Sequence, residues 1–426
     1  MLNESIHYRD GDLYCNSVPI AEIVAQTGTP VYIYSLPRAL ANLKTIQSAF
    51  PRAHIHFSAK SNANLAVLRA LINAGAGIDA VSGGEIHRAL LAGAKPEAIV
   101  FAGVGKTANE LFFAVDQNIG WFNVENVEEA HLLNAIAGTA GKTVRVALRF
   151  NPDVAANTHP HIATGHGGAK FGLSADAVRD LLENRADTPN LRYEGIHIHI
   201  GSQLHDTNAT VQAVRAALDL IAPYPFMTTI DIGGGFPALY QPDESLPTAA
   251  DFAAALEPLL QRYNVILEPG RSIIADAGLL VARVLYVKQQ GEQTFLITDA
   301  GMTELIRPAL YNAHHEIVAL HLSSNTNIEK APLSPSAGSE RQTYTVVGPI
   351  CETADTLAKS VSLPPTQSGD YLAILSAGAY GMVMASNYNA RPRPPEVVIT
   401  EDGQRWQVAR RRETWADLVQ YEIELM

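Results

Sequence analysis

The hydrophobic and polar positions of this chain change their period after residue 268. Before it, short apolar runs alternate with segments whose apolar residues recur every three to four positions, as in an amphipathic helix. The runs predict eight strands, near residues 53–59, 77–81, 98–102, 121–124, 143–150, 194–200, 228–232 and 264–268. Helical patterns fill most of the gaps, for example 63–74, 84–92, 107–117, 126–136, 175–184, 208–222 and 249–260.

Eight strand–helix units are typical of a TIM-type (β/α)8 barrel, and a doubly wound open sheet is the alternative. We expect the α/β barrel to span residues 36–275, beginning with a helix that Ser35 and Pro37 start. The later strand patterns, near 279–290, 293–298, 316–321, 343–348, 371–375, 396–400 and 404–410, show no helical period between them. They predict a second, mostly antiparallel β domain of sandwich or barrel type, made of residues 1–35 and 276–426.

Composition and charge narrow the class of protein. The chain has 426 residues, 47% of them hydrophobic, and a net charge of −12, which argues against nucleic acid or an anionic membrane as a partner. We find no signal peptide and no apolar run that could span a bilayer. Two cysteines, Cys15 and Cys351, are too few for a disulfide framework, so we expect a cytoplasmic protein.

Chemically unusual residues follow the predicted barrel strands, at the end where barrel enzymes carry their active sites. The first strand ends at Lys60, whose ammonium needs a partner if it is buried. Such a lysine can form a Schiff base with a cofactor aldehyde, whereas a surface lysine is the ordinary alternative. Residues 323–341 are polar and rich in helix breakers, and we expect a mobile loop without chemistry there.

Glycines dominate the ends of the last two strands. Gly233, Gly234 and Gly235 expose backbone N–H groups that can hold phosphate, and Gly270 and Arg271 follow the next strand. Barrels frequently bind phosphate with these two loops, although a tight turn is the alternative reading of a triple glycine.

Three ionisable residues lie close to these glycines in the pattern. His197 and His199 are two apart on a strand and project to one face, so they could bind metal, but no third ligand stands out. An imidazole stacked on a cofactor ring fits His199 better. Glu268 would be buried at a strand end, with a protonated ring nitrogen or Arg271 as its partner.

Three runs in the β domain combine reactive groups with Gly or Pro, as binding loops do. They are residues 306–311, 347–355 and 378–381, which contain Arg307, Cys351, Glu352 and Tyr380. Cys351 could instead be a small buried hydrophobic residue, and the others could be surface groups or structural pairs.

With these residues assembled, the chain resembles the diaminopimelate decarboxylases, which belong to the alanine-racemase-like (fold type III) pyridoxal-phosphate enzymes. The wider group shares the segments 57–62, 199–201, 233–235 and 268–271. The segments 299–311, 348–352 and 381–395 are more specific to this decarboxylase, and Thr164-Gly165 and residues 170–172 are also similar to it. Ser58, Ser61 and Thr353-Ala354 depart from the commoner residues.

The resemblance implies decarboxylation of meso-2,6-diaminopimelate to L-lysine and CO2, the last step of lysine biosynthesis. Lys60 would hold pyridoxal 5'-phosphate and Cys351 would donate a proton, since a cysteine thiol is protonated at neutral pH. His199 would stack on the ring and Glu268 would bind its nitrogen. The phosphate would lie among Ser202, Gly233, Gly234, Gly235, Gly270, Arg271 and Tyr380. The substrate would contact Arg271, Arg307, Tyr311, Glu352 and Tyr380.

The resemblance further implies a head-to-tail homodimer in which Cys351 and Glu352 reach the partner's barrel. Two rival functions remain open. The run 306–311 argues against the first, another fold type III decarboxylase that acts on carboxynorspermidine or a siderophore precursor. A non-catalytic relative typically loses the lysine or the cysteine, and this chain has both.

Overall fold

The computed structural model describes residues 1–154, 170–321 and 341–423. It divides into two compact units, one of residues 1–39, 239–244 and 274–426 and the other of residues 40–238 and 245–273. The loop predicted without chemistry at residues 323–341 lies outside the described residues except for its last residue, and Thr164-Gly165 also lies outside them. No described helix is long and apolar enough to cross a membrane.

The second unit contains the predicted barrel. Eight parallel strands close on themselves, with the last pairing to the first through Ile266 and His54. The strands are β5 (Ala53–Ser58), β6 (Gly77–Ala80), β7 (Ile99–Phe101), β8 (Trp121–Val124), β9 (Val144–Arg149), β10 (Leu191–His197), β11 (Thr229–Asp231) and β12 (Asn264–Leu267). Closure confirms the (β/α)8 prediction and excludes the open sheet.

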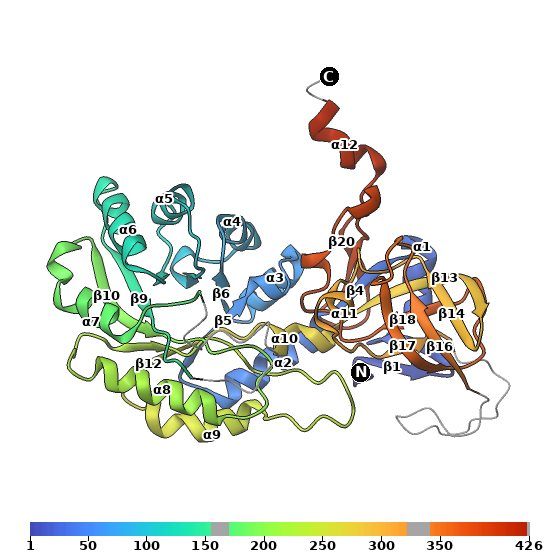
Figure 1. The fold of residues 1–426 in the computed structure, drawn as a ribbon, viewed down its shortest axis with the longest axis horizontal. Helices are drawn as coiled ribbons and strands as arrows, with labels where there is room; N and C mark the ends of the chain where they lie inside the picture. The colour runs from blue at the N-terminus through green and yellow to red at the C-terminus, as the bar shows by residue number, and fades with distance from the viewer. Residues whose placement is uncertain (155–169, 322–340, 424–426) are drawn as a thin grey trace. The chain divides into compact units, whose positions relative to one another are not determined.

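Helices lie outside the barrel, the first before β5 and the others each after one of the strands β5 to β11 (Figure 1). They are α2 (Leu36–Ala49), α3 (Leu65–Asn73), α4 (Gly83–Ala92), α5 (Ala108–Asp116), α6 (Val127–Thr139), α7 (Ala175–Glu183), α8 (Asn208–Ile221) and α9 (Ala249–Leu260). Most begin at a polar side chain that accepts a hydrogen bond from the first turn, which stabilises a helix start by about 1 kcal/mol. These N-cap residues are Asn64, Ser82, Thr107, Asn126, Ser174 and Thr248.

The first unit is built on a mixed, mostly antiparallel sheet with the path β17-β16-β14-β13-β4-β19-β20, to which β18 and β15 add. Its strands are β4 (Val31–Ser35), β13 (Gly278–Gln290), β14 (Gln293–Thr298), β15 (Ile317–Ala319), β16 (Gln342–Val347), β17 (Thr356–Leu363), β18 (Tyr371–Ile374), β19 (Glu396–Ile399) and β20 (Trp406–Arg410). A small separate sheet holds β1 (Ile6–Arg9), β2 (Asp12–Cys15) and β3 (Val18–Pro19).

The prediction of this unit was wrong in two respects. It omitted β17, an edge strand whose alternation is broken where Ser360 takes a φ of 55°. It also allowed no helices among the strands, whereas the structure has α1 (Ile20–Thr27), α11 (Arg307–Tyr311) and, after β20, α12 (Trp415–Ile423). The helix α12 buries none of its residues, although Trp415, Leu418 and Val419 recur at helical spacing.

Candidate active site

Lys60 lies in the 3-10 turn Ala59–Ser61, directly after β5. Its Nζ donates a hydrogen bond to Oδ2 of Asp79 at 2.9 Å, and the hydroxyl of Ser58 donates to the same oxygen. Asp79 is fully buried on β6, and burial together with the charge of Glu268 raises the pKa of its carboxyl, which Lys60 lowers again. Lys60 is therefore held by a buried acid, unlike an ordinary surface lysine.

Glu268 lies one residue beyond β12 and is buried among polar groups. Its Oε2 is 3.4 Å from Nε2 of His197, and Asn123 donates to its Oε1 at 3.2 Å and to Oδ2 of Asp231 at 3.3 Å. The three residues that contact it come from three different strand ends, β8, β10 and β11. Barrel closure thus assembles the cluster.

The pKa values of Asp231 and Glu268 are shifted in opposite directions. Burial, and then the charge of Glu268, raises the pKa of Asp231 well above its ordinary value. Burial alone would also raise the pKa of Glu268, but His197, Lys60 and a hydrogen bond with Asp231 outweigh it and lower that pKa. Asp231 is therefore the protonated member and Glu268 the anion, ready to hold a positively charged N–H group.

The same residues bear on the metal alternative. His197, Asp231 and Glu268 each place one possible ligand atom within 4.8 Å of the others, whereas His199 is not part of this group. His197 therefore has two carboxylates as possible co-ligands, which the sequence did not indicate, and the same anionic group also suits a protonated ring nitrogen.

The triple glycine follows β11 and contacts His199. Gly234 N–H donates to Nδ1 of His199 at 3.2 Å, so that nitrogen carries no proton. Burial and then the charge of Arg149 lower the pKa of His199 well below its ordinary value, which leaves a neutral ring. A side chain at Gly234 would place Cβ 2.6 Å from the carbonyl oxygen of Glu268, so the turn admits only glycine there.

Arg271 and Gly270 lie on the neighbouring loop. The Nε and an Nη atom of Arg271 donate to the hydroxyl of Ser202 at 3.2 and 3.1 Å. A Cβ at Gly270 would lie 2.9 Å from Cβ of Ser58. Small residues and an arginine thus bring the loops after β10 and β12 together, as a phosphate site requires.

The barrel residues fit the chemical parts of pyridoxal phosphate. An amine beside a buried acid suits the aldehyde, the Glu268 anion suits a protonated ring nitrogen, and the glycine turn suits the phosphate. Oδ1 of Asp79 and Nδ1 of His197 are among the described buried polar atoms without a hydrogen-bond partner, and Nε2 of His197 has only the 3.4 Å contact to Glu268. Buried polar atoms left in this state indicate that the cluster is built to receive a further polar group.

The other predicted site residues belong to the first unit. Cys351 and Glu352 are exposed, so Cys351 is not the buried hydrophobic residue of the alternative reading. Cys351 Sγ is 3.7 Å from Oδ1 of Asn389, and Tyr388 donates its hydroxyl hydrogen to Glu352. The buried carboxylate of Asp355 holds the segment by accepting from Met302 N–H and Ile350 N–H, both at 2.6 Å.

Arg307 begins α11 and is buried although it is charged. One of its Nη atoms lies 2.8 Å from Nε2 of His315, and its guanidinium lies over the ring of Tyr240, 4.7 Å from the centroid. Tyr311 ends the same helix and is half-buried. Tyr380 has a φ of 55°, which is rare for a bulky side chain and is typical of functional sites.

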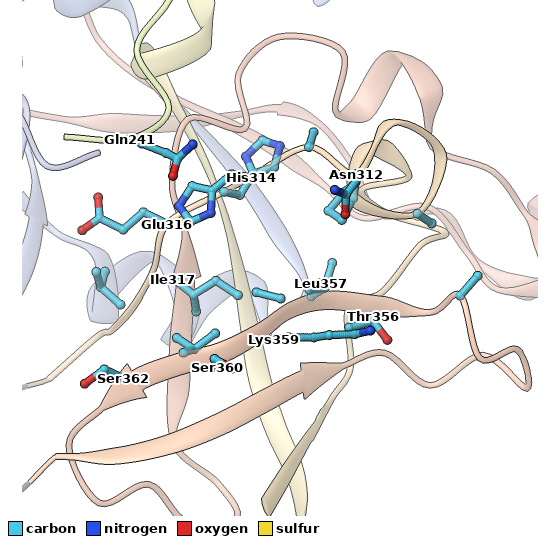
Figure 2. Close-up of a pocket in the computed structure, with 18 of the residues that line it drawn as sticks. Gln241, Asn312, His314, Glu316, Ile317, Thr356, Leu357, Lys359, Ser360 and Ser362 are labelled. Carbon is cyan, nitrogen blue, oxygen red and sulfur yellow. The ribbon is translucent and has the colours of Figure 1, made fainter. Parts of the chain in front are cut away.

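A hollow of about 770 Å3 opens between α11 and the edge strands β15 and β17 (Figure 2). Thr353 and Ala354, which follow Cys351 and Glu352 in sequence, lie on its wall together with His314 and Lys359. The hollow therefore borders two of the segments that carry predicted substrate-binding residues.

The sequence analysis assigned no role to Asp79, Asn123, Asp231, Arg149 or Asp355. Arg149 is buried, and its Nη1 donates to Oε1 of Glu125 at 2.6 Å. The available signal was an ionisable or amide residue inside an apolar strand run, as Asp79 is within β6. Such a residue must find a partner on a neighbouring strand, but one sequence does not say which.

Three comparisons place the chain among known proteins. Residues 38–275 match the family model described as pyridoxal-dependent decarboxylase, pyridoxal binding domain. The diaminopimelate decarboxylase of Aquifex aeolicus is 41% identical, over 99% of this chain and 98% of that protein. That of Vibrio cholerae is 41% identical over 97% of each.

Solved structures agree. Diaminopimelate decarboxylase from Helicobacter pylori in complex with L-lysine has a TM-score of 0.86 at 36% identity, covering 96% of this chain and 100% of that one. The M. jannaschii enzyme in co-complex with L-lysine has a TM-score of 0.90 at 33% identity, covering 99% and 98%. The chain belongs to the diaminopimelate decarboxylase family of pyridoxal-dependent decarboxylases.

Proposed function

We propose that this protein uses pyridoxal phosphate to remove CO2 from meso-2,6-diaminopimelate and to form L-lysine, the last step of lysine biosynthesis. The observation that carries the proposal is the barrel-mouth cluster in which Lys60 is paired with buried Asp79 while Glu268 is kept anionic. A cofactor with a cationic ring and a reactive carbonyl needs an amine and an anion at the same strand ends. Few other functions need both of these groups there.

Pyridoxal phosphate, when bound, supplies an aldehyde for the substrate amine and an electron-poor ring that accepts the electron pair left by CO2. Lys60 is the amine that holds the aldehyde, and Asp79 accepts a proton from it. Glu268 keeps a proton on the ring nitrogen, because an anion next to that nitrogen favours its charged form. His199, neutral and flat, would pack against the ring, and the phosphate would be held by Gly233, Gly234, Gly235, Gly270, Arg271, Ser202 and Tyr380.

The residues of the first unit complete the reaction on the substrate side. The Cys351 thiol donates a proton to the carbon that has lost its carboxylate. Arg307, Arg271 and Tyr311, with Tyr380, bind the distal carboxylate of the substrate, and Glu352 binds its distal ammonium. Lysine and ornithine lack the distal carboxylate, so they do not make the charge-assisted contacts to these guanidinium groups and are rejected.

We further propose a cytoplasmic homodimer in which Cys351 and Glu352 serve the partner's barrel. The exposure of both side chains supports this arrangement, because a proton donor works best when it is shielded from water. Two rival functions differ from this proposal. The other decarboxylase would act on a different substrate, and the non-catalytic relative would release no CO2.

Release of CO2 from meso-2,6-diaminopimelate, L-lysine and L-ornithine tests the function directly. We expect fast release only from diaminopimelate, and selectivity should fall in Arg307→Ala. A preference for L-lysine or L-ornithine, or for carboxynorspermidine in a fourth assay, would replace the proposal with another decarboxylase. Binding of pyridoxal phosphate without any CO2 release would indicate a non-catalytic relative.

A further inference from the structure

His315 is a buried histidine to which the mechanism above gives no role. It lies between α11 and β15 and is 1% exposed. Its Nδ1 is 2.9 Å from the carbonyl oxygen of Leu375, and its Nε2 is 2.8 Å from an Nη atom of Arg307. The imidazole therefore bridges the backbone after β18 and the guanidinium predicted to bind substrate.

The two contacts fix the hydrogens of the ring. A carbonyl oxygen can only accept, so Nδ1 carries the hydrogen that it donates to Leu375. A guanidinium can only donate, so Nε2 is bare and accepts from Arg307. The ring is thus neutral, and burial, followed by the charge of Arg307, lowers the pKa of His315 well below its ordinary value.

The Tyr240 ring contacts the Arg307 guanidinium from a second direction. The Arg307 carbon Cζ lies 4.7 Å from the centroid of the Tyr240 ring, and that ring meets the His315 ring edge to face, with centroids 5.5 Å apart. Arg307 itself is 6% exposed. The hydrogen bond to His315 and the Tyr240 ring together fix the orientation of the Arg307 guanidinium. They thereby fix the directions of its other N–H groups.

We propose that His315 is a positioning residue that orients the Arg307 guanidinium for the distal carboxylate of the amino-acid substrate and so sets substrate specificity. This inference rests on the function proposed above. It assigns to His315 an effect on recognition that should be seen in KM and in the choice between substrates, with no direct part in the chemical step.

Two substitutions separate positioning from packing. In His315→Gln, the amide N–H can donate to Leu375 and the amide oxygen can accept from Arg307, so both contacts can be kept. In His315→Leu, the bulk remains but the acceptor is lost, and a buried guanidinium N–H is left without it. The neighbouring His314 is exposed on the wall of the hollow in Figure 2, so His314→Leu is the matched control.

Steady-state kinetics with meso-2,6-diaminopimelate and the holoenzyme measure the effect. We expect His315→Leu to raise KM by about 10- to 100-fold, the usual result of removing a hydrogen bond to a buried charged group, with kcat changed much less. Preference for diaminopimelate over L-lysine should fall by a similar factor. His315→Gln and His314→Leu should remain within about threefold of the wild type, which is within the spread of neutral substitutions.

A double-mutant cycle with Arg307→Ala shows whether His315 acts through that residue. We expect His315→Leu to add nothing to the KM effect of Arg307→Ala, whereas independent effects that multiply would overturn the proposal. An unchanged KM in His315→Leu, or an equal loss in His315→Gln, would also overturn it. If His315→Leu fails to fold, a raised KM in His315→Gln, which can keep both contacts, would still overturn the proposal. Failure of the wild type to release CO2 from diaminopimelate would instead refute the proposed function.

Discussion

The side chains at the carboxyl ends of the barrel strands and those of residues 347–355, the Cys351 segment, are positioned in opposite ways. Around Glu268, ionisable side chains are buried and set one another's charges, with Asp231 holding the proton and Lys60 paired to Asp79. Around Cys351, the reactive side chains are exposed and one buried acid, Asp355, fixes the backbone.

This difference indicates a division of labour. Charges inside the barrel interact strongly because little water screens them, so the cofactor site is organised before any ligand binds. The thiol on the exposed segment has a side-chain contact to Asn389, and Asp355 holds the backbone that carries it. Changes in the barrel should therefore affect cofactor binding and chemistry together, and changes in the segment should affect turnover alone.

The largest effect is expected from Lys60. Lys60→Ala should lower CO2 release by a factor on the order of 1,000 or more, because the covalent attachment point is lost. Lys60→Arg keeps a cation for Asp79 but cannot form that attachment, so it should be equally inactive and more stable than Lys60→Ala. Urea unfolding and CO2 release measure the two properties, and an active Lys60→Arg would contradict the assignment.

The opposite pKa shifts of Asp231 and Glu268 lead to the next prediction. Glu268→Gln should lower kcat by about 10- to 100-fold, because a charge-assisted hydrogen bond to the ring nitrogen is lost. Asp231→Asn should stay close to the wild type, since an amide resembles a protonated carboxyl. Infrared spectra of the cofactor-free protein should show a carboxylic-acid band that disappears in Asp231→Asn. If that band is absent from the wild type, both carboxylates are charged and the account of the cluster is wrong.

A smaller effect should follow from loosening the exposed segment. Asp355→Ala removes the carboxylate that accepts from two backbone N–H groups. This loss should lower the free energy of unfolding by about 1–3 kcal/mol. The turnover number should fall while the affinity for pyridoxal phosphate stays unchanged. A matched loss of cofactor affinity, measured by titrating the cofactor-free variant, would show that the two regions are not independent.

The last prediction concerns the pH dependence of the barrel's stability. Burial lowers the pKa of His56 on β5 from 6.5 to about 4. The folded state therefore favours the neutral ring, so its stabilisation is complete above pH 6.5 and is lost as the pH falls toward 4, by about 3 kcal/mol in all. The difference in unfolding free energy between wild type and His56→Gln should shrink over this range. An unchanged difference would mean that His56 is not held neutral.

The sequence predicts the barrel strands and the end at which function lies, because apolar runs and strand-end residues are local signals. It does not predict the pairing of Asp231 with Glu268 or of Arg307 with His315, since those contacts join residues that only the closed fold brings together. The edge strand β17 was missed for a local reason, as the irregular backbone at Ser360 interrupts its alternation.

Cys351→Ala provides the most direct test of this division of labour. The account predicts that the cofactor-free variant binds pyridoxal phosphate with the affinity of the wild type, while CO2 release from meso-2,6-diaminopimelate falls by about 100-fold or more, as for loss of a general acid. Wild-type turnover in Cys351→Ala, or a large loss of cofactor affinity, would contradict it.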